Sequence, residues 1–528
     1  MKITSQIEEF KDAASSKLPC LYSHFPLKFL DVENAQKGRK KHCVLGRQFN
    51  GLFSEPDGNF IEISINLSNN YFEVDRDNYG SIPLYYSSKH LLLSTDPRLL
   101  FEDETNALDM TAIGEYLSAA YISGGNTIYQ NIKILMPDEI IVIKPHSFEI
   151  KKKLIFPAIS INSENEVENL LERAIDNSIM NLIDYIPGSA YLNLSGGADS
   201  SLILSKIHEI SGSAENIMTS TYFHADWRKD IDDWRYAEFV SKKYNTTHSR
   251  VDIYNEDFRT SNLELSLKSK YLFHTYSTAF YIQNKTFNNL HLDIPIINGS
   301  GPDESMIGTE KLTISDLVSK KNMPKKDWIN YMLSNFDYLK LNQEAVNNLL
   351  LQDCGSISES RKIILECLLD SPDFLEFQRR YHTLTVLQDH IRELSFVSLC
   401  SNRQILFPYL TNDIFKLVFS TNFESLNRNL MYKSAVKNIL MKYLPYDFVF
   451  RKKIGFQSPS HPYFASDFGC GKEIRRLLSK PSNIINIDYA KVNILNKLQN
   501  SSDLFKRYDF MEWTVFNLLI LEENICKT

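Results

Sequence analysis

The sequence predicts two folds in one chain: an α+β N-terminal domain rich in strands (residues 1–155), and an α/β domain with a doubly wound parallel sheet and a helical C-terminal part (residues 165–528). Three observations lead to this prediction. Short runs of β-branched and aromatic residues, separated by turn residues, fill the first 150 positions. Strand and helix patterns then alternate as far as residue 300. Beyond residue 310 the apolar residues recur mostly at helical spacing.

The N-terminal domain is expected to be a small antiparallel β-structure. Its strand-like runs are NFIEISINL (59–67), YFEVDRD (71–77), PLYYSS (83–88), HLLLST (90–95) and EIIVIKP (139–145). Each run is short, and turn residues separate it from the next. A polar stretch around residues 152–165 joins this domain to the second one.

The second domain begins with a regular alternation of helix and strand. Helices are predicted over 164–186, 199–210 and 232–244, and strands over 189–194, 216–224, 248–254 and 294–299. Such alternation is typical of a parallel sheet with helices on both faces. The later chain holds long amphipathic segments, for example residues 360–391.

Composition excludes several classes of protein. The 528 residues carry 58 Lys and Arg against 65 Asp and Glu, a net charge of −7, which argues against a dedicated nucleic-acid binder. The seven cysteines form no C-x-x-C pair, as expected for reduced thiols in a cytoplasmic protein. The chain has no signal-peptide pattern and no apolar run of about 18 residues, so no membrane span is expected.

The most informative stretch is SAYLNLSGGADSSLI (189–203), in which a strand, two glycines and a helix follow one another. Glycines let the backbone approach a ligand closely, and a helix start offers free N–H groups to an anion. Ser195 and Ser200 add hydroxyl donors. Asp199 would repel a phosphate unless Mg²⁺ lay between them. The stretch therefore indicates a pyrophosphate–Mg²⁺ site; a helix cap is the plainer alternative for Asp199.

A second loop supports this interpretation. IPIINGSGPDESMIG (294–308) again follows an apolar strand, and carries Gly299, Gly301, Asp303 and Glu304. The carboxyl ends of neighbouring parallel strands meet at one edge of the sheet, where a second Mg²⁺ ligand belongs. Taken alone, this loop is simply a surface turn.

These segments resemble those of the asparagine synthetase family. SGGADSS (195–201) is similar to its S-G-G-x-D-S pyrophosphate loop, and NGSGPDE (298–304) to its second loop. LFPYLTNDIFKLVFS (406–420) resembles the family's V-P-F-L-D segment. MYKSAVKNILMKYLPYDFVFRKKIGFQSP (431–459) resembles its K-x-x-L-R … R-x-K-x-G-F ending, and DRDNYGSIPLYYSS (75–88) resembles the glutamine amidotransferase strands. The resemblance implies an Ntn-hydrolase-like first domain and an ATP-pyrophosphatase fold for the second.

The resemblance also implies roles for individual residues. ATP and Mg²⁺ are the expected cofactors, with Asp199 and Asp303 as metal ligands and catalytic residues. Lys453 falls where the family has a lysine that stabilises developing negative charge; without the flanking match it is simply a solvated charge. The ATP pocket is assigned to Leu194, Ser195, Gly196, Gly197, Asp199, Ser200 and Gly299.

The first domain departs from its glutamine-hydrolysing relatives. Their nucleophile is a cysteine that becomes N-terminal after removal of Met, whereas residue 2 here is Lys. Cys20 would need removal of 19 residues and lacks a following glycine. The family's R-G-P-D and N-G-E-I-Y-N stretches are absent. A degenerate domain that does not hydrolyse glutamine is expected.

The residues expected near the substrate also depart from the family's pattern. Ser300 stands where asparagine synthetases have Glu, β-lactam synthetases have Tyr and lasso-peptide cyclases often have His. Gln404 replaces an acid of the family, and an amide cannot serve as a general base. His390 and Asp389 are candidates for the missing role, although an exposed pair on a helix is the simpler interpretation of both.

The expected function is ATP-dependent amide formation through an acyl-adenylate, with a small-molecule or peptide carboxylate as substrate. A lasso-cyclase-like reaction is favoured, with a precursor peptide and a partner protease as possible associates. Asparagine synthesis from ammonia and β-lactam-like cyclisation remain alternatives. Two alternatives lie outside this class. If the protein were a tRNA-modifying ATP-pyrophosphatase, a basic face and catalytic cysteines would be expected. If it were an inactive binding subunit, loss of Asp199, Asp303 or Lys453 would be expected.

Overall fold

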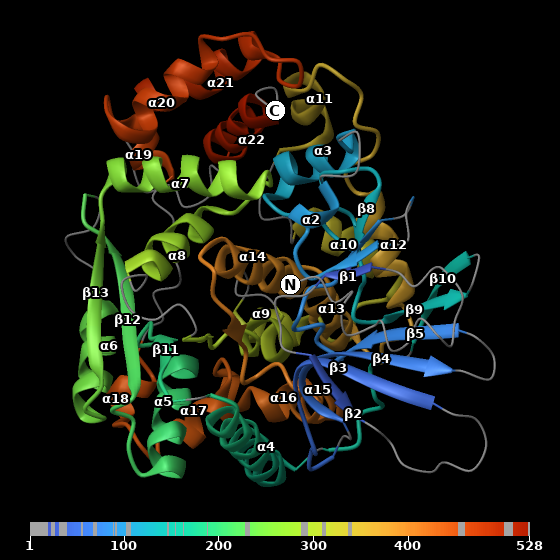
Figure 1. Ribbon diagram of the computed structural model, residues 1–528, viewed down its shortest axis with the longest axis vertical. Helices are drawn as coiled ribbons and strands as arrows, with labels where there is room; N and C mark the ends of the chain where they lie inside the picture. Colours follow the sequence, from blue (N-terminus) through green and yellow to red (C-terminus); the bar gives the residue numbers. More distant parts are fainter. Residues whose placement is uncertain are drawn as a thin grey trace.

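The computed structural model describes residues 20–22, 27–30, 40–53, 56–66, 71–87, 89, 92–101, 107–144, 147–153, 155–161, 163–186, 188–226, 233–286, 294–308, 313–335, 341–451, 460–500 and 511–525. In Figure 1 the N-terminal sheets and the parallel sheet lie on opposite sides of the molecule, and the C-terminal helices cover one end. No described helix has both the length and the apolar character needed to cross a membrane.

The N-terminal domain is β-rich, as predicted, but it contains two sheets. The larger is wholly antiparallel, with the strand order β10 (Ser147–Lys152), β9 (Glu139–Lys144), β5 (Tyr71–Arg76), β4 (Asp57–Asn66), β3 (Lys40–Phe49) and β2 (Leu27–Leu30). The smaller has the order β1 (Cys20–Tyr22), β7 (Leu92–Ser94), β6 (Tyr85–Ser87) and β8 (Ile132–Ile134), with β1 and β7 parallel. Helices α2 (Arg98–Phe101) and α3 (Met110–Ala119) complete it.

The second domain is built on the predicted parallel sheet. Its order is β13 (Thr247–Ile253), β12 (Ile217–His224), β11 (Ala190–Asn193), β14 (Ile296–Ile297) and β15 (Ile405–Leu406), and every pair is parallel. The flanking helices are α4 (Glu164–Tyr185), α5 (Ala198–Ser211), α6 (Asp233–Lys243), α7 (Asn255–Ser269) and α8 (Thr275–Thr286). Helices α6 and α8 pack on β12 and β13, and α5 packs against α4.

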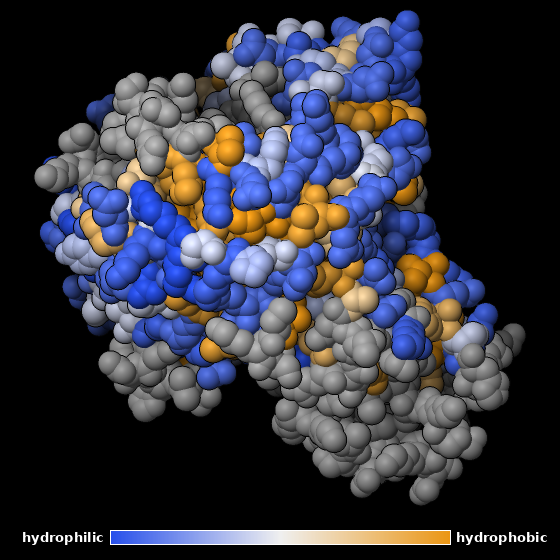
Figure 2. Space-filling model, turned by 90° about the horizontal axis from the view of Figure 1, so that it is seen from above, coloured by the Kyte–Doolittle hydropathy of each residue, from blue (hydrophilic) through white to orange (hydrophobic). Residues whose placement is uncertain are grey.

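In the rest of the described chain the regular elements are helices, apart from β15. The helices are η2 (a π-helix, Asp303–Ile307), α9 (Ile314–Ser319), α10 (Lys325–Asn335), α11 (Gln343–Leu349), α12 (Glu359–Cys367), α13 (Phe374–Leu384), α14 (Val386–Cys400), α15 (Asn412–Ser420), α16 (Phe423–Leu426), η3 (Arg428–Leu430), α17 (Ser434–Leu440), α18 (Tyr446–Val449), α19 (Ser460–Ala465), α20 (Gly469–Leu478), α21 (Ile487–Asn500) and α22 (Met511–Ile525). Figure 2 views the end formed by the C-terminal helices, where apolar side chains form a band across a polar surface.

The amphipathic segment 360–391 is divided among three helices. Pro372 cannot supply a backbone N–H and disfavours helix at the residue before it. The Asp373 side chain then caps α13 by accepting the Glu376 N–H at 3.0 Å. Helix α14 begins after a second break at Thr385, whose φ and ψ are −123° and −78°.

The two domains share one apolar core. Phe156, in the segment that joins them, packs against Phe415 and Phe419 of α15, with ring centroids 5.5 and 4.8 Å apart. Tyr79 of the N-terminal domain meets the same Phe415 ring edge-on at 4.9 Å. Helix α15 is therefore held both by the N-terminal domain and by the joining segment, which helps to fix the loop that precedes it.

Candidate active site

The two glycine loops lie together at the point where the strand order of the parallel sheet reverses. Strands β12 and β13 follow β11 on one side, whereas β14 and β15 lie on its other side. A Cβ atom built on Gly299, after β14, would lie 3.2 Å from the Ser200 nitrogen, so the loops are in close contact. Doubly wound sheets bind their ligands at such reversal points, beyond the carboxyl ends of the strands.

The first loop is shaped by its glycine and its neighbours. Leu194 continues the sheet: its side chain is buried and its N–H donates to the Ser220 carbonyl at 3.0 Å. Gly196 has φ of +72°, and a Cβ there would lie 2.7 Å from the Ala237 nitrogen. Only glycine suits that position. The Arg451 guanidinium donates to the Gly196 carbonyl at 2.8 Å and so holds the turn from the other side.

The hydroxyl groups of the loop are bonded to one another. The Ser195 N–H donates to Ser200 Oγ at 3.2 Å, the two hydroxyl oxygens lie 3.1 Å apart, and the Gly197 N–H donates to Ser195 Oγ at 3.2 Å. Helix α5 starts at the next residue, Ala198. The loop thus presents hydroxyls and a helix N-terminus at one place, an arrangement suited to phosphate oxygens.

Asp199 and Asp303 face a single cation. The ammonium of Lys433 lies 2.6 Å from Asp199 Oδ2 and forms an ion pair with Asp303 Oδ1. The Lys433 side chain is only 4% exposed, against 18% and 30% for the two carboxylates. Two carboxylates, one in the first turn of α5 and one at the start of η2, therefore point at one position, and this donor set suits Mg²⁺ together with phosphate oxygens. The described residues contain no group of three or more His, Cys, Asp or Glu side chains arranged to hold a metal.

Lys433 was not among the residues predicted for the site. Its sequence signal was the lysine of MYKSAV, which matches the start of the family's K-x-x-L-R pattern. The backbone explains its placement: the Lys433 N–H donates to Asn427 Oδ1 at 2.9 Å, and Asn427 Nδ2 donates to the Met306 carbonyl of η2 at 2.9 Å. Asn427 thus joins the lysine to the loop that carries Asp303.

A third loop, residues 407–411, connects the site to the N-terminal domain. The Tyr409 hydroxyl donates to the Asp199 carbonyl at 2.9 Å, and burial raises the pKa of this phenol well above its usual value. Asn59 of the N-terminal domain donates to the carbonyls of Phe407 and Leu410, at 3.2 and 2.7 Å. The first domain therefore supports a residue that touches the first glycine loop.

Ser300 lies on the second loop, and His390 of α14 lies opposite that loop. Both the N–H and the hydroxyl of Ser300 donate to Asn298 Oδ1, at 2.9 and 2.6 Å. His390 Nδ1 lies 3.6 Å from Glu304 Oε1, and its side chain is only 16% exposed. Asp389 is buried and paired with Arg392. The interpretation of His390 and Asp389 as an exposed pair was wrong, because α14 is covered by neighbouring elements.

The structure does not bring the other predicted residues to this place. Gln404 precedes β15, at the amino edge of the sheet, and its Nε2 donates to the Tyr185 hydroxyl at 3.0 Å. Lys453 lies outside the described residues; Arg451, two positions earlier, contacts the first loop. The backbone of Cys20 belongs to β1, and its side chain is outside the described part.

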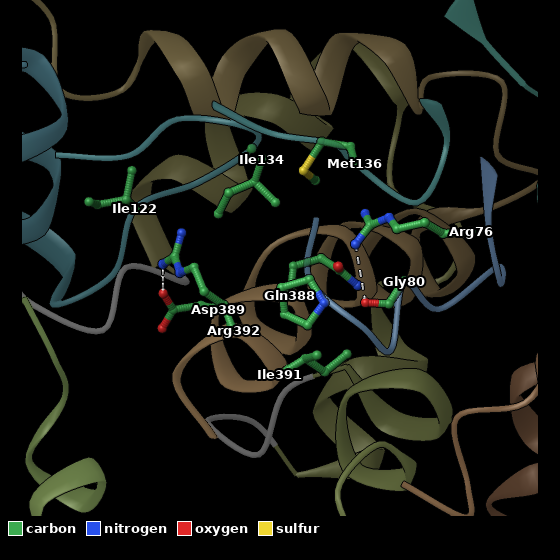
Figure 3. Close-up of a pocket in the computed structure, with 11 residues that line it drawn as sticks. Arg76, Gly80, Ile122, Ile134, Met136, Gln388, Asp389, Ile391 and Arg392 are labelled. Carbon is green, nitrogen blue, oxygen red and sulfur yellow. Dashed lines mark hydrogen bonds and ion pairs between the residues drawn. The ribbon is translucent and has the colours of Figure 1, made fainter. Parts of the chain in front are cut away.

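A small cavity lies elsewhere, between the N-terminal domain and α14 (Figure 3). Arg76 and Gln388 line it, and the Gln388 amide donates to the Tyr79 carbonyl at 2.7 Å. The Arg76 guanidinium donates to backbone carbonyls, among them that of Ile82 at 3.1 Å. The space is about 10 Å³, enough for one water molecule. It is too small to receive a nucleotide.

Two family models match the chain. Residues 167–516 match the asparagine synthase model, and residues 52–153 match a glutamine amidotransferase domain. A search of curated proteins finds none that matches.

Solved structures that match include an NH₃-dependent NAD synthetase from Campylobacter jejuni subsp. jejuni NCTC 11168 (17% identity, 27% of this chain and 60% of that one). Another is a glutamine-dependent NAD⁺ synthetase from Acinetobacter baumannii, with 12% identity over 48% of this chain and 51% of that one. A third is an NMN synthetase from Francisella tularensis, with 14% identity over 44% of this chain and 96% of that one. The TM-score is 0.20 for each, and the chain spans only 60% and 51% of the first two. The asparagine synthase model covers more than half of the chain, and the chain belongs to the asparagine synthase family.

Proposed function

We propose that the protein is an ATP-dependent, AMP-forming amide synthetase that adenylates a substrate carboxylate. The observation that carries this proposal is the convergence of Asp199 and Asp303 on one cation, beside a glycine loop at the start of a 14-residue helix. Carboxylates repel phosphates unless a cation lies between them. Their presence beside an anion-binding loop therefore fits a metal–nucleotide complex better than a free anion.

The reaction has two steps. A carboxylate oxygen of the substrate attacks the α-phosphorus of ATP, the bond from that phosphorus to the bridging β-phosphate oxygen breaks, and pyrophosphate leaves. An amine nitrogen then attacks the acyl carbon, the bond from that carbon to AMP breaks, and the amine loses a proton to a base. Mg²⁺, when bound, supplies charge stabilisation on the departing pyrophosphate.

The residues divide the work as follows. Asp199 and Asp303 hold the metal, and Ser195, Gly196, Gly197 and Ser200 receive the pyrophosphate. Leu194 and Gly299 shape the ATP pocket, since both lie where a sheet strand passes into a loop. Lys453 stabilises negative charge as the intermediate forms, and Ser300 faces the incoming nucleophile.

Isotope exchange tests the first step. Labelled pyrophosphate should enter ATP only when a suitable carboxylate is present, and Asp199→Asn should lower the exchange rate by about 10³-fold. Asp447→Asn, the same change at an exposed position, is the matched control and should keep full exchange. Full exchange in a folded Asp199→Asn protein would show that the metal assignment is wrong.

We also propose that the N-terminal domain does not hydrolyse glutamine. In the glutamine-hydrolysing enzymes that this domain resembles, a glycine follows the nucleophilic cysteine. Here Cys20 is followed by Leu21, and Cys43 by Val44. Its residues instead serve contacts with the second domain, as Asn59 does. Glutamate release from glutamine at a rate comparable to amide synthesis would contradict this proposal.

For the substrate we favour the side-chain carboxylate of a peptide, joined to the peptide's own amine as in lasso-peptide cyclases. The support is the proposal above that the first domain does not hydrolyse glutamine and so supplies no ammonia; Gln404 gives no support, because it lies at the amino edge of the sheet, beside Tyr185. Pyrophosphate exchange should be compared for free aspartate with ammonia, for a β-amino acid, and for peptides with Asp or Glu and a free N-terminus. Peptide-dependent exchange with loss of one water from the peptide mass is expected; exchange with aspartate alone would favour asparagine synthesis.

A further inference from the structure

The ammonium of Lys433 lies where the carboxylates of Asp199 and Asp303 converge. Its ammonium lies 2.6 Å from Asp199 Oδ2 and is also paired with Asp303 Oδ1. These are the two carboxylates assigned to Mg²⁺ above, so this inference rests on the proposed function. One site between two carboxylates cannot hold an ammonium and a divalent cation at once, because the two cations repel each other at such short range.

The backbone around Lys433 is built to hold this arrangement. Lys433 has φ of +51°, a left-handed conformation that is uncommon for a residue with a side chain. Asn429 and Leu430 also have positive φ, so three such residues fall within five positions. Left-handed residues of this kind persist where their surroundings over-determine them, often at functional sites. Here the Asn427 side chain fixes the Lys433 N–H and reaches the η2 backbone.

The side chain, in contrast, can move. A lysine carries its charge on a flexible four-carbon stem, so the ammonium can change partners while the backbone stays fixed. The pyrophosphate loop lies next to Asp199. A nucleotide bound at this loop would offer its phosphate oxygens to the ammonium as new partners.

We propose that Lys433 is the resident cation of the nucleotide-free site. Its ammonium neutralises Asp199 and Asp303 until a metal–nucleotide complex binds, and then leaves the carboxylates for phosphate oxygens. The metal alone therefore binds weakly, since it must first displace the ammonium from both carboxylates. Metal and nucleotide bind together, each raising the affinity for the other.

Mn²⁺ binding without nucleotide tests this proposal. Free Mn²⁺ is measured by electron paramagnetic resonance for the wild type, Lys433→Met, Lys433→Gln and the double variant Lys433→Met/Asp199→Asn. Both single variants should bind Mn²⁺ about ten-fold or more tightly than the wild type, and the double variant should lose that gain. Lys437→Met, one turn further along α17, is the matched control and should bind as the wild type does.

The outcomes separate the inference from the proposed function. Unchanged or weaker Mn²⁺ binding in both folded single variants, while Asp199→Asn still loses Mn²⁺–ATP binding, would overturn the role of Lys433 alone. Unchanged Mn²⁺–ATP binding in Asp199→Asn would overturn the metal site itself. The glutamine variant keeps the test valid if the methionine variant does not fold, because its polar side chain is easier to accommodate beside two carboxylates.

Discussion

Two pairs of carboxylates in this molecule differ in how their negative charge is balanced. At the candidate active site, Asp199 and Asp303 share the ammonium of Lys433. At the boundary between the domains, Asp57 of β4 meets Asp413 of α15, and the Asp413 N–H donates to Asp57 Oδ1 at 3.1 Å. Burial, and then the charge of Asp413, raise the pKa of Asp57 to about 7.

The difference shows what each pair is suited to do. A pair that faces a cation can exchange that cation for another. In the second pair, burial raises the pKa of Asp57, so that this carboxyl takes up a proton more readily and favours a fixed contact. Asp413 also accepts the N–H groups of Leu52 and Phe53, at 2.5 and 2.9 Å. The first pair is thus suited to chemistry, and the second to holding the domains together.

The largest expected effect comes from changing the active-site pair. Asp303→Asn should lower pyrophosphate exchange by about 10³-fold, because it removes a charge that faces the metal position. Asp57→Asn, the same change in the other, buried pair, should leave exchange within about two-fold of the wild type, since substitutions at distant and independent sites act separately. Similar losses in both variants would abolish the distinction between the pairs.

A smaller effect is expected in the pH dependence of stability. The pKa of Asp57 is raised in the folded protein from 3.8 to about 7, so the native state binds the proton more tightly. This stabilisation is present below pH 4 and is lost as the pH rises to 7, by about 2–4 kcal/mol in the free energy of unfolding. In Asp57→Asn that loss should disappear, which urea unfolding at pH 5 and pH 8 can measure. An unchanged slope in the variant would mean that Asp57 is ionised across this range.

The smallest effect is expected at the loop that links the two pairs. Tyr409→Phe removes the hydroxyl that donates to the Asp199 carbonyl and should lower kcat of exchange by about ten-fold, because small displacements of a catalytic loop are costly. The KM for ATP should change less. Tyr446→Phe, at an exposed phenol, is the control, and equal kcat values in the two variants would exclude a role for the Tyr409 hydroxyl.

Much of the fold was accessible from the sequence. The strands before each glycine loop and helices such as α4, α5 and α6 were predicted to within a few residues, because apolar periodicity reports directly on burial. Strands β1, β2, β3, β8, β10 and β15 were missed. In β3 and β10 charged residues interrupt the apolar pattern, as in KKHCVLGRQF. The break between α12 and α13 was also missed, although Pro372 marks it.

The site was only half accessible. Asp199 and Asp303 follow adjacent strands, and their proximity follows from the rules of parallel sheets. Lys433 is 234 positions from Asp199, and no local pattern indicates that a left-handed backbone would bring it between the two carboxylates. The contact of Asp57 with Asp413 spans 356 positions and depends on how two domains dock, which periodicity does not report.

Residues 407–413 have a practical consequence for protein engineering. They carry Tyr409 toward the pyrophosphate loop and Asp413 toward the N-terminal domain, so one short segment belongs to both halves. A truncation that begins at residue 165 would remove the contacts that the first domain and the joining segment make with Asp413, Phe415 and the carbonyls of residues 407 and 410. Chimeras within the family should therefore exchange residues 52–59 and 407–413 as a single unit. The first domain is best regarded as a structural part of the second domain, from which it cannot be removed without loss of these contacts.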